Sequence, residues 1–376
     1  MKLFINLSNI QGGGAHQVAV SFLSELSKIN ANNDYWVVYN PSLKAQVKKL
    51  NLASRFASYE VDNSPSTLLY HFKIVHQLDK WVTEFSPDIV FTLFGPTSWK
   101  PKVKHLCGFG NSLFLYPKEL FNSILPVKAR ILNSIIYRLK LLNLKRESRY
   151  FVVEADHVKQ QMIKRMNLSS SHIWVVGNTC SGVFYNEHQE VFKYVPRFEN
   201  EYRLLVITSF YPHKNIAILK AVCERLHQLD ITNIRFFISV TEELLKKNRM
   251  YHPFIIPLGN VPHEKLPSLY EQIDATFAPT LIESFTAVYP ESMKMGKPIL
   301  TSDLFFAHDL CQDAALYFDP LNAEDIVEKI INLYHSSDEQ QKLVAKGKEV
   351  MKSFLSAEKR AKRYIEICEF IVNHNE

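Results

Sequence analysis

The chain has 376 residues, of which 47% are hydrophobic, 12% aromatic and 22% charged. This length predicts two domains, each large enough for its own core. The composition excludes disordered, collagen-like and low-complexity chains. The formal net charge is +6, from 44 Lys and Arg against 38 Asp and Glu. An excess of this size does not choose between nucleic acid, a membrane and anionic small molecules as partners.

The cysteines and the apolar runs indicate the cellular compartment of the protein. The five cysteines lie far apart and form no Cys-x-x-Cys pair, so we expect reduced thiols rather than disulfides or a cysteine zinc site. The apolar run in Met1–Ser8 is too short for a signal peptide. No run reaches the roughly 20 apolar residues that span a bilayer. These features predict a cytoplasmic protein.

The first half alternates short β-branched or aromatic runs with helix-period segments. The predicted strands, in chain order, are Leu3–Leu7, Tyr35–Tyr39, Ile89–Leu93, Tyr150–Val153 and Ile173–Val176. The predicted helices are His16–Lys28, Thr67–Phe85 and Asp156–Met166. Strands alternating with helices predict a parallel sheet wound through right-handed crossovers.

The second half repeats this alternation. Its predicted strands are Leu204–Thr208, Arg235–Val240, Phe254–Leu258, Ala275–Ala278, Pro298–Thr301 and Leu316–Phe318. The rhythm is lost over Gly182–Asn200, which we interpret as a linker. We therefore predict an α/β protein of two Rossmann-like domains, residues 1–182 and 201–355, facing each other across a cleft. A final amphipathic helix, within residues 356–376, could cross back to the first domain.

A glycine-rich loop follows the first predicted strand. Gly12, Gly13 and Gly14 are consecutive in a chain with only 11 glycines. Glycines let backbone N–H groups approach an anion or a sugar closely, next to the positive end of a helix. The spacing is not that of a dinucleotide-binding loop, and no acidic residue ends the second strand. The alternative is a plain strand-to-helix turn.

Two loops of the second half carry candidate chemistry. Lys214 follows the predicted strand Leu204–Thr208, where a lysine and a helix N-terminus suit a phosphate leaving group. Glu283 and Glu291 bracket the turn after the strand Ala275–Ala278. A carboxylate can accept from two vicinal hydroxyls, as ribose or a hexose offers. The alternatives are a solvated lysine, a helix-capping acid and a surface glutamate.

The order of these motifs resembles the retaining glycosyltransferases of the GT4 (group 1) type, which have the GT-B fold. The resemblance covers residues 204–335 well. It reaches the first half through Gly12–Gly14 and more weakly through Val152–Val158. The motifs that carry it are Glu283 and Glu291, Met295-Gly296-Lys297-Pro298, Ser302-Asp303, Asp313-Ala314-Ala315, Asp319-Pro320, and the segments Leu258–Pro262 and Leu266–Tyr270, which look like the family's segment around the nucleobase.

The resemblance implies a role for each matching residue. Glu291 is expected to hold the ribose hydroxyls of the donor, Glu283 to lie near the transferred sugar, and Lys214 to neutralise the diphosphate. Lys214 and Glu283 are thus the predicted catalytic residues. The full predicted donor site is Gly13, Gly14, Ser209, Lys214, Glu283, Ser284, Phe285, Thr286 and Glu291.

The chain departs from the family at two places. An arginine usually stands where Ser209 is found, and Gly-Phe-Gly usually stands where this chain has Ser284-Phe285-Thr286. Backbone amides and the added hydroxyls could still meet phosphate. No Asp-x-Asp sequence occurs, so the metal-chelating route of the other large glycosyltransferase fold lacks its ligands. We expect a reaction without metal or other cofactor.

Three further residues are candidates for acceptor or sugar contacts. His16 adjoins the glycine loop, and His105 and Glu154 are placed in the first domain. The chain has 14 histidines, so an ordinary packing or surface role is the competing interpretation of each.

The positive charge is concentrated in one region. Residues 100–150 contain 11 Lys and Arg against Glu119 and Glu147, a balance of 11 − 2 = +9. Within it the six apolar residues Ile131, Leu132, Ile135, Ile136, Leu139 and Leu142 share a helical face, from which Arg130, Arg138, Lys140 and Lys145 are excluded. Such a helix suits an anionic membrane interface. A packed helix with a solvated basic face is the alternative. No nucleic-acid-binding module accompanies the charge.

The sequence therefore predicts a hexosyltransferase-type glycosyltransferase, retaining and metal-independent, that acts on a nucleotide sugar and a glycan or lipid-linked glycan acceptor. We place it in surface polysaccharide synthesis of the O-antigen or capsule kind, in the cytoplasm or at the inner face of the membrane. The competing predictions are a nucleotide-sugar epimerase on the same fold and a catalytically silent two-lobed binding partner.

Overall fold

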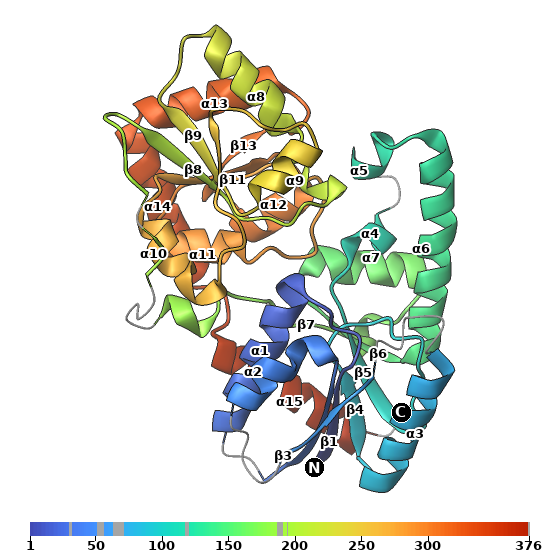
Figure 1. Ribbon diagram of the computed structural model, residues 1–376. Coiled ribbons are helices and arrows are strands. Elements are labelled where there is room, and N and C mark those ends of the chain that lie inside the picture. The colour runs from blue at the N-terminus through green and yellow to red at the C-terminus, as the bar shows by residue number, and fades with distance from the viewer. Residues whose placement is uncertain are drawn as a thin grey trace. The chain divides into compact units, whose positions relative to one another are not determined.

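A computed structural model describes residues 1–29, 32–50, 56–62, 71–116, 120–185, 191–193 and 195–374. Its contacts divide the chain into two compact units (Figure 1). The first unit is Met1–Asn178 with Leu355–Glu376, and the second is Thr179–Phe354. Thr67–Tyr70 of one predicted helix, Lys118 and Glu119 of the basic region, and residues 186–190 and 194 of the predicted linker lie outside the described residues.

The first unit alternates strands and helices along most of its length. Its elements are β1 (Lys2–Leu7), α1 (Gly13–Lys28), β2 (Asp34–Tyr39), α2 (Lys44–Lys49), β3 (Phe56–Glu60), α3 (His71–Phe85), β4 (Ile89–Thr92), β5 (Lys104–Phe109), α4 (Ser112–Leu115), α5 (Leu120–Ser123), α6 (Val127–Glu147), β6 (Tyr150–Val153), α7 (Asp156–Met166), β7 (Ile173–Val175) and, at its end, α15 (Ala357–Asn373).

The second unit has the same alternation. Its elements are β8 (Tyr202–Val206), α8 (Ile218–Gln228), β9 (Ile234–Ile238), α9 (Glu242–Lys247), β10 (Ile255–Pro257), α10 (Leu266–Glu271), β11 (Ala275–Ala278), α11 (Val288–Lys294), β12 (Ile299–Ser302), α12 (Phe305–Cys311), β13 (Ala315–Phe318), α13 (Ala323–His335) and α14 (Ser337–Met351).

Each unit is built on one parallel sheet, which confirms the predicted α/β class. In the described residues the first sheet has seven strands in the order β3-β2-β1-β4-β5-β6-β7, and the second has six in the order β10-β9-β8-β11-β12-β13. Alternate side chains of a strand point to opposite faces of the sheet. Leu3 and Ile5 of β1 therefore pack with α1 and α15, whereas Phe4 packs with α3 on the other face.

Two strands of the first sheet were missing from the sequence prediction. β3 has the sequence FASYE and β5 has the sequence KHLCGF. Neither shows a run of β-branched residues or a clean alternation of apolar and polar residues. They form because their neighbours β2, β4 and β6 supply parallel hydrogen-bonding partners.

The last helix returns to the first unit, as the sequence analysis allowed. Tyr364 of α15 meets Phe22 edge to face, with ring centroids 5.5 Å apart, and lies 5.1 Å from the ring of Phe91. Arg360 of α15, 1% exposed, donates to Asn178 and, at 2.9 Å, to Ser21 Oγ. Helix α15 is thus part of the core of the first unit.

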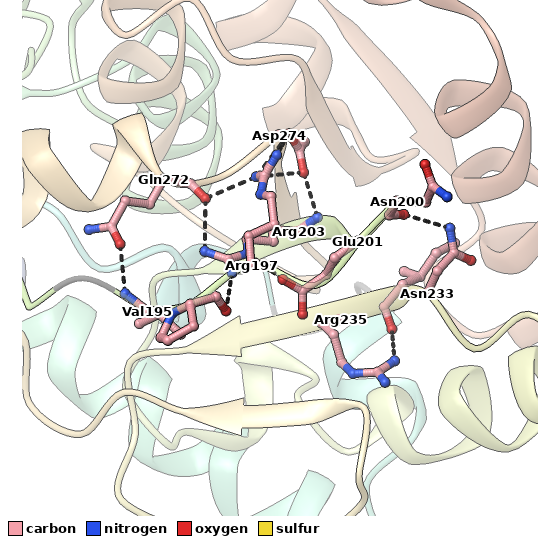
Figure 2. A network of polar contacts seen from close by, with 11 residues as sticks. Val195, Arg197, Asn200, Glu201, Arg203, Asn233, Arg235, Gln272 and Asp274 are labelled. Carbon is pink, nitrogen blue, oxygen red and sulfur yellow. Dashed lines mark hydrogen bonds and ion pairs between the residues drawn. The ribbon is translucent and has the colours of Figure 1, made fainter.

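A buried ionic network holds the chain where it enters the second sheet (Figure 2). Arg203 is 1% exposed; its Nε donates to Glu201 at 2.6 Å and its guanidinium lies 4.9 Å from the ring of Phe237. Asp274 accepts from the Arg203 amide at 2.7 Å and from Arg197 at 3.1 Å. The network pairs the buried charges of Arg203 and Glu201 and holds the amino ends of β8 and β11 together. The loops that follow these two strands leave from the opposite ends.

Two further findings concern the whole described chain. All five cysteines are buried and none forms a disulfide. In the part of the chain that the structure describes, no helix is both long and apolar enough to cross a membrane.

Candidate active site

The candidate site lies where the strand order of the second sheet reverses. Strand β8 has β9 on one side and β11 on the other, so the connections leaving β8 and β11 diverge to opposite faces. Such a reversal leaves room at the carboxyl ends of the two strands, where open α/β sheets bind their ligands. The loops that follow β8 and β11 contain the predicted residues Ser209, Lys214 and Glu283.

The two loops are joined by hydrogen bonds. The loop after β8 forms a 3₁₀ turn, Pro212–Lys214, which ends at Asn215 in the left-handed region with φ 52°. The His213 carbonyl accepts from the Leu281 amide at 2.7 Å and from Thr280 Oγ1 at 3.2 Å. Burial lowers the pKa of His213, so this ring adds no positive charge at neutral pH.

Lys214 and Glu283 form an ion pair. Lys214 Nζ donates to Glu283 Oε1, and Thr280 Oγ1 donates to the same oxygen at 2.9 Å. The side chains are 23% and 10% exposed, respectively. A partly exposed cation at the carboxyl edge of the sheet can meet an anion, and the carboxylate balances its charge until one binds. Ser209 is exposed on the same loop, and its carbonyl accepts from the Tyr211 amide at 2.8 Å.

The segment Ser284–Thr286 leads into α11. Ser284 and Thr286 are buried, and the Phe285 ring meets Phe354 edge to face at 6.0 Å. Neither Ser284 nor Thr286 has a positive φ. The backbone here is therefore open to residues with side chains, and the departure from Gly-Phe-Gly brings no backbone strain.

Glu291 is a buried carboxylate on α11. It is 3% exposed, and Tyr270 donates its hydroxyl to Oε2 at 3.2 Å. His263 Nε2 lies 4.0 Å from Oε1; burial lowers the pKa of His263, which leaves this ring neutral at pH 7. Burial also raises the pKa of Glu291 to about 7. No described residue hydrogen-bonds Oε1, so this carboxylate keeps most of its acceptor capacity.

Sequence reasoning missed the residues around Glu291. Tyr270 was noted only as the end of the segment Leu266–Tyr270, and His263, in the 3₁₀ turn His263–Lys265, was not singled out. Their proximity to Glu291 is a consequence of the sheet, which sets α10 and α11 beside each other. The one available signal was that Leu258–Pro262 and Leu266–Tyr270 look like the family's segment around the nucleobase.

The glycine loop lies at the corresponding reversal of the first sheet, between β1 and β4. Gly12, Gly13 and Gly14 are exposed, and a Cβ added at any of them would meet nothing within 4 Å. Gly13 has φ +67°, a conformation that favours glycine. His16 Nε2 lies 3.1 Å from the Ser42 carbonyl. This loop is open enough to approach a ligand with its backbone.

His105 and Glu154 have partners inside the first unit. His105 is 5% exposed on β5; its ring nitrogens lie 2.9 Å from Thr92 Oγ1 and 2.9 Å from the Glu147 carbonyl. Burial lowers its pKa to about 4. This placement favours a structural role over the predicted acceptor contact. Glu154, at the end of β6, accepts from Asn178 Nδ2 at 3.1 Å, and Asn178 in turn accepts from Arg360.

The second unit also has a hollow away from these residues. A hollow of about 500 Å³ lies at the amino ends of β11 and β12, lined by Asp274, Lys297 and residues of α14. It is at the opposite end of the strands from Lys214 and Glu283. Among the described residues, no group of three His, Cys, Asp or Glu side chains is arranged to hold a metal ion.

The comparisons with known proteins show similarity to glycosyltransferases. A profile of the family described as "Glycosyl transferases group 1" matches residues 187–350, the part that holds Lys214, Glu283 and Glu291. A curated relative is the O-antigen chain mannosyltransferase RfbU of Salmonella typhimurium, 23% identical over 184 residues. The match covers 48% of this chain and 50% of RfbU, so the chain matches about half the length of that relative.

Solved structures match over nearly the whole chain. WaaG, a glycosyltransferase involved in lipopolysaccharide biosynthesis, is 12% identical with a TM-score of 0.70 and covers 100% of both chains. Anabaena HepE, solved in complex with UDP-glucose, is 11% identical with a TM-score of 0.70 and covers 98% of this chain and 100% of its own. These matches show the GT-B fold. With the family profile, they support a group 1 glycosyltransferase.

Proposed function

We propose that this protein transfers a sugar from a nucleotide-diphosphate sugar to a glycan or lipid-linked glycan, with retention and without a metal ion. The observation that carries the proposal is the Lys214–Glu283 pair at the strand reversal, close in sequence to a buried carboxylate, Glu291, that keeps an unused acceptor oxygen. A cation for a phosphate and a carboxylate for vicinal hydroxyls are the two groups that a nucleotide sugar requires.

Each residue has a physical task in this reaction. Breaking the sugar–phosphate bond places negative charge on the diphosphate, and Lys214 Nζ stabilises that charge as it develops. Glu283 releases Lys214 to the phosphate and accepts from hydroxyls of the transferred sugar. Glu291 accepts from the ribose hydroxyls through Oε1. Ser209, Ser284 and Thr286 add hydroxyl or amide donors near the phosphates.

The proposed substrates follow the relatives. RfbU is described as a mannosyltransferase of the O-antigen chain and WaaG as part of lipopolysaccharide synthesis, which supports a hexosyl donor and a surface-glycan acceptor. HepE binds UDP-glucose, which supports a nucleoside diphosphate as leaving group. A lipid-linked acceptor would place this protein at the cytoplasmic face of a membrane.

Nucleotide binding gives the first test. We would measure the thermal unfolding midpoint with UDP, GDP, UDP-glucose and GDP-mannose, each in EDTA and in MgCl₂, because a ligand that binds the folded state raises the midpoint. At least one should raise it in EDTA. Lys214→Met should weaken that binding about 10- to 100-fold, since a hydrogen bond to a charged group contributes roughly 1.5–3 kcal/mol. Lys220→Met, at an exposed lysine of α8, is the matched control. Equal binding by both variants would contradict the assignment of Lys214.

Turnover distinguishes transfer from the competing functions. Purified protein incubated with the nucleotide sugar that binds should release nucleoside diphosphate slowly, with water as acceptor, and the anomeric configuration of the freed sugar should match the donor by NMR. Interconversion of two nucleotide sugars would indicate an epimerase instead. Full loss of activity with EDTA would rule out metal independence.

A further inference from the structure

Helix α6 has two apolar faces, and only one of them is packed. Tyr137, Leu141 and Leu144 are buried on the inner face, where the Tyr137 ring lies 5.3 Å from Phe114 of α4. Figure 1 shows α6 as a long helix with α4 and α7 on its inner side. The outer side chains are 37–59% exposed: Val127, Ile131, Leu132, Ile135, Ile136, Leu139 and Leu142.

The six apolar residues grouped by the sequence analysis are therefore not core residues. A soluble surface shows scattered apolar side chains, whereas a contiguous row along one helix marks an interaction site. The row runs from Val127 to Leu142, so it is about 23 Å long at 1.5 Å per residue. Burying seven such side chains more completely would be favourable by roughly 25 cal/mol for each Å² removed from water.

The charges around the row have one sign. The exposed charged side chains of α6 are all basic: Lys128, Arg130, Arg138, Lys140, Lys145 and Arg146. The single acid of the helix, Glu147, is buried. Arg138 and Lys145 are seven residues apart and lie along one edge of the apolar row, and Lys140 lies along the other. An apolar row between two basic edges complements a surface with an apolar interior and anionic groups.

We infer that the outer face of α6 docks in the plane of an anionic phospholipid bilayer. The apolar row enters the boundary between headgroups and acyl chains, and the basic edges contact the anionic headgroups. A second copy of the chain is a poorer occupant, because packing two such faces together would bring their basic edges together. Only the purpose of this docking, access to a lipid-linked acceptor, rests on the proposed function.

Vesicle sedimentation tests the inference. The full chain should bind vesicles of 70% phosphatidylcholine and 30% phosphatidylglycerol and should bind pure phosphatidylcholine at least ten-fold more weakly. Raising the salt concentration should weaken the first binding. The combined variant Arg138→Glu, Lys140→Glu, Lys145→Glu and the combined variant Ile131→Ser, Ile135→Ser, Leu139→Ser should each bind the anionic vesicles at least ten-fold more weakly.

A matched control separates local from overall charge. The combined variant Lys220→Glu, Lys342→Glu, Lys352→Glu changes the net charge equally at exposed lysines of the second unit and should bind as the unchanged protein does. If the two charge variants bind equally, or if neutral and anionic vesicles are bound equally, the inference is overturned. It is also overturned if the serine variant keeps lipid binding and converts a dimer to a monomer in size-exclusion chromatography.

The lipid assay is independent of the transfer reaction. Nucleotide binding without vesicles should be unchanged in all three combined variants, which also reports that they are folded. Lipid binding without nucleotide binding would leave the docking surface standing and remove the proposed function. The opposite result would remove only the docking surface.

Discussion

Each unit contains an almost fully buried glutamate, Glu147 in the first and Glu291 in the second, and the two lie in different environments. Glu147 and Glu291 are each 3% exposed, and burial raises the pKa of each to about 7. Glu147 accepts from the Thr97 amide at 2.9 Å and from the Ser98 amide at 2.5 Å, and also from the Thr97 hydroxyl at 3.2 Å. Glu291 accepts one hydrogen bond, from Tyr270. The two carboxylates are therefore equally buried but differ in the number of hydrogen bonds that they accept.

The difference separates a structural acid from a ligand-binding one. Glu147 uses both oxygens to hold the loop after β4 to the end of α6, so little acceptor capacity is left for a ligand. Glu291 has one oxygen without a hydrogen-bond donor among the described residues, which is costly unless a ligand supplies donors. Burial and pKa alone would assign both to the same class. The number of donors distinguishes them.

The largest expected effect is on activity at Glu291. Glu291→Ala should remove the acceptor for the ribose hydroxyls and lower transfer and donor hydrolysis by about 100-fold or more, which is roughly 3 kcal/mol of transition-state stabilisation. The thermal midpoint without ligand should stay within a few degrees, because the buried acid gives up a single hydrogen bond, from Tyr270. Near-normal turnover of the variant would end the assignment of Glu291 to the donor site.

The reverse result is expected at Glu147. Glu147→Ala leaves two backbone amides and a hydroxyl without their acceptor, and each unpaired buried group costs about 1–3 kcal/mol. We expect the free energy of unfolding, measured with urea, to fall by about 4 kcal/mol. Nucleotide affinity of the folded variant should be unchanged. A loss of affinity in folded protein would break the distinction between the two acids.

Stability should fall as pH rises toward neutrality. Both acids have a folded pKa of about 7 against an ordinary 4.5, so the folded state binds more protons between these values. The stability that each provides is fully present below pH 4.5 and is lost as pH rises through 7. Each acid should contribute about 2–3 kcal/mol to the loss between pH 4.5 and 8. For Glu147→Gln, the free energy of unfolding measured with urea should change less steeply with pH, by an amount that corresponds to about one proton. An unchanged slope would show that Glu147 does not contribute to the pH dependence.

Nucleotide-sugar affinity should change with pH in the opposite direction. The ionised form of Glu291 is the better acceptor for two hydroxyls, so affinity should rise from pH 6 to 8 and level off above the pKa. Calorimetric titration with the nucleotide sugar that binds would measure this. Glu291→Gln should bind weakly at every pH, whereas Glu147→Gln should keep the full pH dependence.

The smallest effect is expected at Tyr270. Tyr270→Phe removes the hydroxyl that donates to Glu291 Oε2 and should weaken nucleotide-sugar binding about 3- to 10-fold, or roughly 1 kcal/mol. Because that hydrogen bond stabilises the ionised acid, its loss should also move the midpoint of the affinity profile to higher pH. Weaker binding with an unmoved midpoint would show that Tyr270 acts by packing alone.

The sequence predicted local features well. Strand Ala275–Ala278 and helix Asp156–Met166 have the predicted bounds, because apolar periodicity is a local property. Lys214 and Glu283 became candidates for the same reason, since each follows a recognisable strand. The sheet order that brings them together as an ion pair is a tertiary property.

What the sequence did not predict depends on tertiary contacts, which leave no local pattern. No strand was predicted over β5, so the burial of His105 was not expected. The contact of Tyr270 with Glu291 spans 21 residues and has no local pattern. The outer face of α6 was found as an apolar stripe, but periodicity cannot tell which of two apolar faces meets the core.

The return of α15 to the first unit has a consequence for biosynthesis. The second unit, Thr179–Phe354, is continuous in the chain, whereas the first also needs residues after Leu355. A ribosome therefore completes the second unit while the groove that receives Tyr364, Ile367 and Ile371 still exposes Phe22 and Phe91. The amino-terminal unit is therefore made first but completes its folding last. Until α15 is made, the apolar side chains that it covers are exposed and can bind chaperones or aggregate.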